Sequence, residues 1–324
     1  MRIEQEIPPG CRPECPAGLS QSRKVVYAAI VANVAIAISK FVAAGMTGSA
    51  AMLAEGVHSA VDTGNEFLLL LGMKHSEKPP DEWHPFGYGK VLYFWALIVA
   101  LSVFSLGGGI SIYHGVVALR NLPALEDPTW NYVVLTLAAL FEGYSWNKSR
   151  KELNERRRTD ESLWQAVRRS KDASVFTVFI EDSAALIGIA VASSGIWLGH
   201  QFHNPYIDPV ASVIIGLVLV AAAFALARET GGLLVGESID RDQILKLKEM
   251  ISSEPAVEKV GHLLTMQLGP DHVLLTAAVR FRRGLGINEL EQAIDRLECA
   301  IKAEYPSVHH IFLETGSFRS SFRS

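Results

Sequence analysis

Six long apolar stretches constrain what this chain can fold into more than any other feature. A helix needs about 20 mostly apolar residues to cross the hydrocarbon core of a membrane. The stretches that meet or nearly meet this requirement are residues 25–45, 49–73, 91–119, 129–148, 174–198 and 207–227. The mean hydropathy of +0.21 is high because the apolar residues gather in the first two thirds of the chain. The sequence therefore predicts a multi-pass membrane protein built on an all-α bundle of six helices.

The basic residues predict how these helices are oriented. The connection 149–171 holds eight basic residues, and the connection 74–90 holds Lys74, Lys78 and Lys90. The links that follow the first, third and fifth stretches carry almost no basic residue beyond Arg120. Lysine and arginine accumulate in cytoplasmic loops. Both termini are therefore predicted to face the cytoplasm.

The last third of the chain has the pattern of a soluble domain. Apolar residues recur at helical spacing in 242–252 and 287–305, and the segments 262–268, 272–281 and 308–314 have the composition of strands. The order αββαβ predicts a small two-layer α+β domain. The predicted divisions are an N-terminal cytoplasmic tail, 1–24, a six-span transmembrane domain, 25–234, a cytoplasmic C-terminal domain, 235–318, and a tail, 319–324.

Ionisable residues interrupt two of the apolar stretches. Glu55, His58 and Asp62 are spaced by three and four residues, which puts them on one helix face. An imidazole and a carboxylate at i and i+4 can chelate one divalent ion. In the fifth stretch Glu181 and Asp182 are adjacent, so they point about 100° apart and only one of them can face the second stretch. Charges at this depth are costly and usually functional.

Other interpretations of these charges remain open. The His–Asp pair could be a structural hydrogen bond or a proton relay without metal, and Glu142 in the fourth stretch could serve structure as well as function. Glu55, near the outer end of its helix, could equally be solvated or functional, and we expect Lys40 to extend toward the headgroups. Asp208 is expected at the outer mouth of the sixth stretch, as a poorer ligand. Two acids and an imidazole on facing helices nevertheless favour cation transport.

Three segments resemble the cation diffusion facilitator family. They are TGSAAMLAEGVHSAVD at 47–62, HPFGYGK at 84–90, and Asp208-Pro209 at the start of the sixth stretch. The likeness extends over nearly the whole chain, and the second-stretch signature is its most specific part. The family implies a homodimer that exchanges cytoplasmic Zn²⁺, or a similar divalent ion, for protons. It also implies a tetrahedral site built by ligand pairs on spans two and five, and a metallochaperone-like C-terminal domain.

The resemblance carries over residue by residue only in part. The second-span pair corresponds to His58 and Asp62. On the fifth span Asp182 takes the aspartate position, but Val178 stands where the family has histidine, as in the branch of zinc-transporter-9-like proteins. Glu181 or Glu142 is expected to replace the missing ligand. We expect Asp182 to face span two, and Glu181 to face span four near Glu142 or to carry protons.

The predicted function is a divalent metal/proton antiporter, with Zn²⁺ as the first choice, that exports metal from the cytoplasm. Alternatives are an exporter of Mn²⁺, Fe²⁺ or Co²⁺, since an oxygen-rich site suits these ions, and a membrane metal sensor that does not transport. No nucleotide-binding loop or nucleophile constellation is present, so we predict no enzyme activity and no cofactor besides the transported metal. The predicted partners are the lipid membrane and a second copy of the chain. The net charge of −4 argues against nucleic acid. His84, with His75, could bind metal in its loop or simply orient that loop.

Overall fold

The computed structural model describes residues 23–122, 127–155, 162, 165–167 and 170–315, with side chains from residue 33 onward. The chain divides between Leu234 and Val235 into two compact units, a helical unit and a C-terminal domain. The N-terminal tail predicted at 1–24 and the tail predicted at 319–324 lie almost wholly outside the described residues. Each unit is described below by itself.

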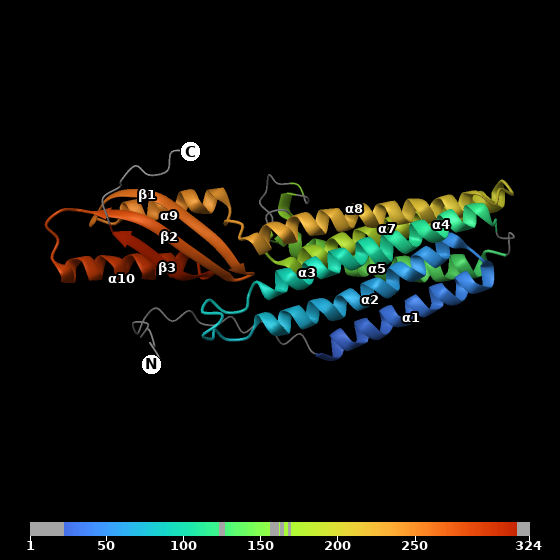
Figure 1. The fold of residues 1–324 in the computed structure, drawn as a ribbon, viewed down its shortest axis with the longest axis horizontal. Helices are drawn as coiled ribbons and strands as arrows, with labels where there is room; N and C mark the ends of the chain where they lie inside the picture. The colour runs from blue at the N-terminus through green and yellow to red at the C-terminus, as the bar shows by residue number, and fades with distance from the viewer. Residues whose placement is uncertain (1–22, 123–126, 156–161, 163–164, 168–169, 316–324) are drawn as a thin grey trace. The chain divides into compact units, whose positions relative to one another are not determined.

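The helical unit contains long helices that run side by side (Figure 1). Its elements are α1 (Arg23–Thr47), α2 (Ala50–Ser76), α3 (Val91–Ser102), the π-helix η1 (Val103–Gly109), α4 (Ile110–Arg120), α5 (Thr129–Glu155), α7 (Ala173–Gln201) and α8 (Ile207–Val235). All six predicted stretches are helical, so the predicted six-helix bundle is confirmed. Within the described residues, three segments are long and apolar enough by themselves to cross a membrane: Val91–Arg120, Ala173–Gln201 and Ile207–Val235.

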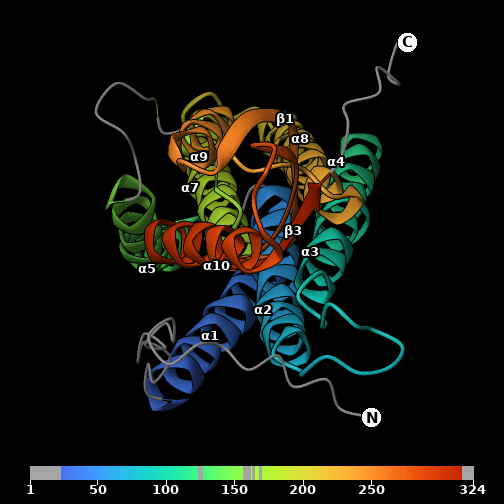
Figure 2. The same ribbon diagram turned by 90° about the vertical axis from the view of Figure 1, so that its left-hand side faces the viewer.

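Helix α2 contacts most of the other helices of the unit. It packs against α1, α3, α4 and α7, and α5 packs against both α1 and α7. The end-on view in Figure 2 shows α1 beside α2. A helix can carry charged side chains on the face that packs against its neighbours, because these neighbours shield the charges from lipid. This arrangement explains why α2 remains a bundle helix although Glu55, His58, Asp62 and Glu66 interrupt its apolar run.

The turn from α1 to α2 is short and depends on one glycine. Gly48 has a φ of +61°, a conformation that side chains with a Cβ rarely adopt. Its backbone N–H donates to the Ala44 carbonyl at 2.9 Å and closes the end of α1. The Ser49 hydroxyl then accepts a hydrogen bond from the Met52 N–H at 3.1 Å and caps α2. The TGS sequence thus sets where α2 begins.

Glycines also allow α8 to approach η1 and α4 closely. A Cβ added at Gly216 would lie 2.6 Å from Ile112 Cγ1 and 2.9 Å from the Gly108 carbonyl oxygen. A Cβ added at Gly115 would lie 2.9 Å from the Pro209 carbonyl oxygen. These helices therefore pack backbone against backbone, as small residues permit in membrane proteins.

The C-terminal domain has the predicted order αββαβ. Its elements are α9 (Arg241–Ser253), β1 (Val257–Gly269), β2 (His272–Phe281), α10 (Ile287–Glu304) and β3 (Val308–Thr315). Strand β2 pairs antiparallel with β1 and parallel with β3, so the sheet order is β1-β2-β3. Helix α9 contacts β1 and α10 contacts β3. The predicted α+β fold is thereby confirmed.

Strand β1 begins at Val257, five residues before its predicted start at His262. Its pairing with β2 is irregular between Val260 and Leu263, and this irregularity breaks the alternation of apolar and polar residues by which a strand is recognised. The apolar core of the domain is regular. It consists of Leu247, Ile251, Val257, Val260, Val273, Leu275, Ala277, Val279, Leu297, Ile301 and Val308.

Candidate metal-binding site

The predicted second-span pair lies in the interior of the helical unit. His58 Nδ1 and Asp62 Oδ1 are 3.3 Å apart, and the side chain of His58 is 1% exposed. Among the described residues, neither ring nitrogen of His58 nor Asp62 Oδ1 has a hydrogen-bond partner, although all three atoms are buried. Buried polar atoms are normally paired. One ring nitrogen of a neutral imidazole carries a lone pair, and so do the carboxylate oxygens, so this pair without hydrogen bonds fits a bound cation.

Glu181 of α7 joins this face of α2. Its Oε1 accepts a hydrogen bond of 2.7 Å from the Asn65 side-chain amide, and Glu181 is buried. Asn65 follows Asp62 by three residues, so it lies on the same face of α2 one turn further on. The hydrogen bond therefore holds a second carboxylate next to the turn that carries Asp62.

Asp182 faces the opposite neighbour, which corrects the predicted orientation. Its Oδ2 accepts hydrogen bonds from the hydroxyls of Ser145, at 2.8 Å, and Ser149, at 3.4 Å, both on α5. The sequence predicts that Asp182 faces span two and that Glu181 faces span four. The two residues differ by about 100° around the helix, and the rotation of α7 is set by its packing between α2 and α5 rather than by the spacing of its acids.

Glu142 of α5 is half-buried and lies toward the same interior. The carboxylates of Glu181, Glu142 and Asp182 are close enough to Asp62 for their charges to act on it. Within the described residues, however, no three His, Cys, Asp or Glu side chains meet in a group that would hold an ion. The structure thus brings the five predicted residues into one region without joining them in a single coordination sphere.

The prediction for Lys40 was wrong, and the solvated alternative for Glu55 is excluded. Both side chains are fully buried, and Lys40 Nζ donates to Glu55 Oε2 at 2.9 Å and to the Ser59 hydroxyl at 2.7 Å. Neither residue is solvated or extended toward headgroups. Hydropathy treats each charge separately, whereas here the two charges compensate each other between α1 and α2.

A second hydrogen bond between α1 and α2 was also missed. Asn33 donates its side-chain amide to Glu66 Oε1 at 2.6 Å. The spacing offered a signal, because Asn33 and Lys40 are seven residues apart and so share one face of α1. That face carries polar groups in an apolar helix, which indicates polar partners on the helix beside it.

Asp208 has a structural role at the other end of α2. Its carboxylate accepts hydrogen bonds from the Ser49 hydroxyl and the Ala50 N–H, both at 2.6 Å, and from the Ala51 N–H at 3.4 Å. A carboxylate at a helix N-terminus satisfies free N–H groups and complements the helix dipole. These contacts occupy both oxygens of Asp208, in line with the expectation that it is a poorer ligand.

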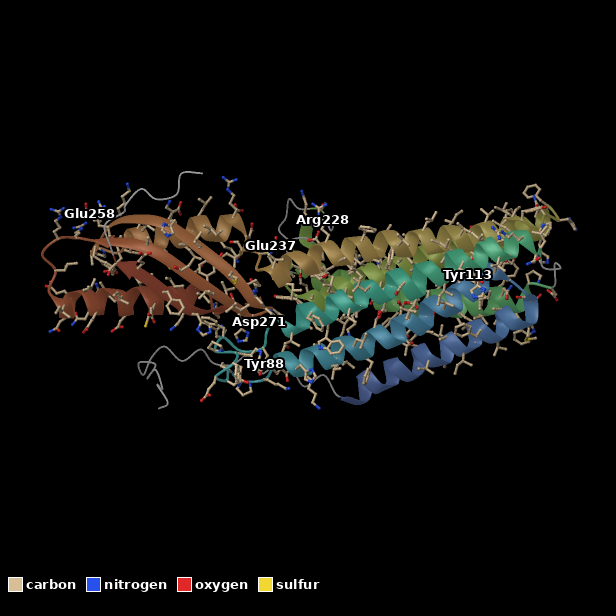
Figure 3. The ribbon with its side chains drawn as sticks, viewed as in Figure 1. Tyr88, Tyr113, Arg228, Glu237, Glu258 and Asp271 are labelled. Carbon is tan, nitrogen blue, oxygen red and sulfur yellow. The ribbon has the colours of Figure 1, made fainter. Side chains whose placement is uncertain are left out.

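The loop between α2 and α3 is ordered around Asp81. Its carboxylate accepts hydrogen bonds from the backbone N–H of His84 at 2.6 Å and from the Tyr88 hydroxyl at 2.5 Å; Tyr88 is labelled in Figure 3. The hydrogen bond from Tyr88, followed by those from His84 and Trp83, lowers the pKa of Asp81. His84 Nδ1 lies 3.2 Å from Asp81 Oδ1, so the contacts of His84 support its role in orienting the loop.

Histidines of the C-terminal domain meet at one end of its sheet. The rings of His272 on β2 and His309 on β3 lie 4.4 Å apart, near the turn that carries Asp271 (Figure 3). Partial shielding from solvent, and then the charge of His309, lower the pKa of His272. His309 Nδ1 is 3.1 Å from the Ser307 carbonyl oxygen. The pair is a titratable contact between two strands at the domain surface.

The sequence of the chain is similar to those of known proteins. Residues 26–235 match the model of the cation efflux transmembrane domain. The chain is 31% identical, over 90% of its length, to the mitochondrial proton-coupled zinc antiporter SLC30A9 of Xenopus laevis, and equally so to that of Homo sapiens. It covers 59% and 58% of these two relatives, somewhat more than half their length. It is also 24% identical to the manganese efflux system protein MneP of Bacillus subtilis, over 92% of the chain and 96% of that protein.

Proposed function

The chain belongs to the cation efflux family, the family that its second-span signature indicated, and from this premise we propose that it transports a divalent metal ion across a membrane in exchange for protons. Zn²⁺ is the proposed substrate. The observation that carries the proposal is the pair His58 and Asp62: Nδ1 and Oδ1 lie 3.3 Å apart, and within the described residues the ring nitrogens and this oxygen make no hydrogen bond. A membrane interior leaves such atoms unpaired only at a cost of several kcal/mol, and a bound metal or proton removes that cost.

We assign the metal donors from the contacts of each side chain. His58 and Asp62 contribute from α2, and Glu181 contributes from α7 because Asn65 holds it on the α2 side. Asp182 and Glu142 belong to the same site on its α5 side. Two serine hydroxyls already hydrogen bond to Asp182, so we give Asp182 and Glu142 the role of carrying protons between the donors and the aqueous side.

The exchange follows from the chemistry of these groups. Metal ligands must be deprotonated, so a proton and a metal ion compete for His58, Asp62 and Glu181. When the site faces the cytoplasm, the donors release protons and bind the ion. When it faces the other side at higher proton concentration, they take up protons and release the ion. Movement of the helices around a fixed site provides this alternating access.

Mn²⁺ is the second candidate substrate. The donor set contains one imidazole and several carboxylates, and carboxylates suit harder ions than Zn²⁺. The likeness to MneP of Bacillus subtilis supports the same alternative, whereas the likeness to the vertebrate zinc antiporters supports Zn²⁺. Uptake of Zn²⁺, Mn²⁺, Fe²⁺ and Co²⁺ by purified protein in proteoliposomes, with and without a pH gradient, tests the substrate and the exchange together. Metal binding without flux would favour a sensor.

A matched pair of substitutions tests the assignment on α7. Glu181→Gln is expected to abolish metal binding, because it removes a donor oxygen on the α2 side. Asp182→Asn keeps the donors and is expected to change mainly the pH dependence of transport. The two residues are adjacent and both buried, so general damage to α7 would affect both variants alike. Loss of binding in Asp182→Asn alone would restore the orientation predicted from the sequence.

We also propose that both termini face the cytoplasm, so that the protein exports metal from it. The eight basic residues between positions 149 and 171 support this orientation. A reporter that is active only in the cytoplasm, fused after Ser324, is expected to be active. Activity of an exclusively extracytoplasmic reporter at the same position would reverse the orientation and the direction of transport.

A homodimer is the proposed assembly. The sheet face opposite α9 and α10 exposes Leu264, Met266 and Phe312, which are 57%, 36% and 54% exposed. Leu264 and Phe312 lie in one row across the sheet, on either side of Thr276. An exposed apolar patch of this kind marks an interaction surface. Replacing Leu264 and Phe312 together by glutamate is expected to yield monomers in analytical ultracentrifugation, whereas Ile287→Glu on α10 should leave the dimer intact.

A further inference from the structure

Lys40 is an ammonium group buried inside the helical unit. Its side chain has 0% exposure, and Nζ donates to Glu55 Oε2 at 2.9 Å and to Ser59 Oγ at 2.7 Å. Among the residues whose side chains the structure describes, Lys40 is the only lysine or arginine that is buried. A charge in this environment is costly even when it is paired. Its presence on α1, at a position where an apolar residue would pack without this cost, needs a reason.

The position of Nζ relates Lys40 to the metal site. Ser59 directly follows His58 and precedes Asp62 by three residues, so Nζ lies beside the turn of α2 that carries both proposed donors. The charge of Lys40 acts on His58, on Asp62 and on Glu142. The pair thus presents its positive end to the site.

Glu55, which accepts a hydrogen bond from Lys40 Nζ, keeps the ammonium group in place. Its Oε1 is buried and lies against Gly188 of α7, where a Cβ would collide with it. The carboxylate is therefore confined between α1, α2 and α7. Because Glu55 is fixed, the ammonium that it pairs with is fixed as well, and the pair is a permanent dipole rather than a mobile surface ion pair.

We propose that Lys40 is a fixed positive charge of the transport site and that it weakens the binding of the divalent ion so that the ion can leave. This inference rests on the proposed function and concerns the same site. Several carboxylates without a compensating cation would hold a divalent ion tightly, and a transporter needs binding that is favourable enough for the ion to enter yet weak enough for it to leave. The ammonium repels the ion without occupying a ligand position. Because it is part of the chain, its charge stays at the site after the ion leaves.

Four variants of the full chain distinguish this role from a purely structural one. Lys40→Met removes the positive charge and is expected to tighten Zn²⁺ binding by about tenfold or more. Glu55→Gln leaves the ammonium uncompensated and is expected to weaken binding. The double variant Lys40→Met/Glu55→Gln removes the whole dipole, and its affinity should fall between that of the wild type and that of Lys40→Met. Lys40→Arg keeps the charge and should lie closer to the wild type than Lys40→Met does.

The measurements are the dissociation constant for Zn²⁺, by competition with a chelating dye, and the Zn²⁺ flux in proteoliposomes. Lys40→Met is expected to bind Zn²⁺ more tightly and to transport it more slowly, a combination that damage to the fold does not produce. Ser39→Ala, on the same helix and hydrogen bonded only to the Ala35 carbonyl among the described residues, is the control. The double variant leaves no unpaired buried charge, so it remains testable where the single variants do not fold.

The outcomes separate this inference from the proposed function. Wild-type affinity in the double variant, or weaker binding in both single variants, would overturn the role of Lys40 and leave the transport site standing. Absence of Zn²⁺ and Mn²⁺ binding to the wild-type protein would overturn both proposals. The ordered series of affinities, from Glu55→Gln through the wild type and the double variant to Lys40→Met, would support both.

Discussion

The helical unit and the C-terminal domain treat polar side chains in opposite ways. The helical unit buries Lys40, Glu55, His58, Glu181, Asp182 and Asp208. In the described part of the C-terminal domain, Gln267 is the only polar residue that is buried. The core of this domain consists of aliphatic residues and alanine. An aqueous domain is stabilised by apolar burial. A helix bundle in lipid gains little from it, since lipid is as apolar as leucine.

The two regions also pack by different means. Leu247, Ile251, Leu297 and Ile301 fill the space between helices and sheet in the C-terminal domain. In the helical unit, Gly108 and Gly216 have no side chains, and the backbones of η1 and α8 can therefore approach each other. We infer that most of the buried charge in the helical unit belongs to the proposed site, that Asp208 instead holds the start of α2, and that the close packing of the helices depends on small residues. Each of the following substitutions tests one side of this contrast.

The largest expected effect is the loss of transport in Asp62→Ala. The substitution removes a proposed donor oxygen that makes no hydrogen bond among the described residues, so Zn²⁺ and Mn²⁺ flux in proteoliposomes should fall to background while the protein still elutes as a single species. Asp271→Ala, which removes an exposed carboxylate from the turn between β1 and β2, should transport normally. Flux of both metals at the wild-type rate in Asp62→Ala would refute the assignment of the site.

In the C-terminal domain, the large effect should come from removing apolar volume. Ile251 is fully buried between α9 and the sheet, so Ile251→Ala is expected to destabilise the domain by about 2–5 kcal/mol. Hydrogen–deuterium exchange of peptides from β1 and β2 in the full chain measures this loss. Ile287→Ala, at a position that is 77% exposed, is the matched control and should leave exchange unchanged.

In the helical unit, the opposite change should do the damage. Gly216→Ala adds a Cβ 2.6 Å from Ile112 Cγ1 and 2.9 Å from the Gly108 carbonyl oxygen, and such overpacking costs roughly 1–3 kcal/mol. The expected result is a lower melting temperature in detergent. Gly143→Ala on α5, where no atom lies within 4 Å of the added Cβ, should be neutral or slightly stabilising. Equal behaviour of the two variants would mean that glycine packing does not limit the stability of the unit.

The folds of both regions were predictable from the sequence, but for different reasons. Apolar length revealed the six helices, and apolar periodicity with the Gly269-Pro270-Asp271 turn revealed the order αββαβ. The site was predictable only as a set of residue types at suitable depth. Which acid of the pair Glu181 and Asp182 faces α2 depends on the rotation of α7, which packing against α2 and α5 determines.

Contacts between helices were also beyond the sequence pattern. Lys40 and Glu55 are fifteen residues apart on different helices, and their ion pair appears only when α1 packs against α2. Asp208 lies 158 residues from Ala50, and its carboxylate accepts a hydrogen bond from the Ala50 N–H. Periodicity reports the face on which a residue lies but not its partner, so the compensation of these charges could not be predicted.

The smallest expected effect concerns pH and the C-terminal domain, whose charges are otherwise at the surface. The pKa of His272 lies below its usual value of 6.5 because its ring is partly shielded and because His309 is beside it. As the pH falls through about 6.5, the unfolded chain therefore binds a proton before the folded domain does, and the domain loses stability. Hydrogen–deuterium exchange of peptides from β2 and β3 should reveal weaker protection near pH 5.5 than near pH 8, at rates corrected for intrinsic exchange.

His272→Gln should flatten this dependence, and His75→Gln, in the helical unit, should not. Because His272 is an exposed residue, water screens part of the charge, so the effect is small beside that of Ile251→Ala. An unchanged pH dependence in His272→Gln would mean that titration at this pair does not contribute to the stability of the domain.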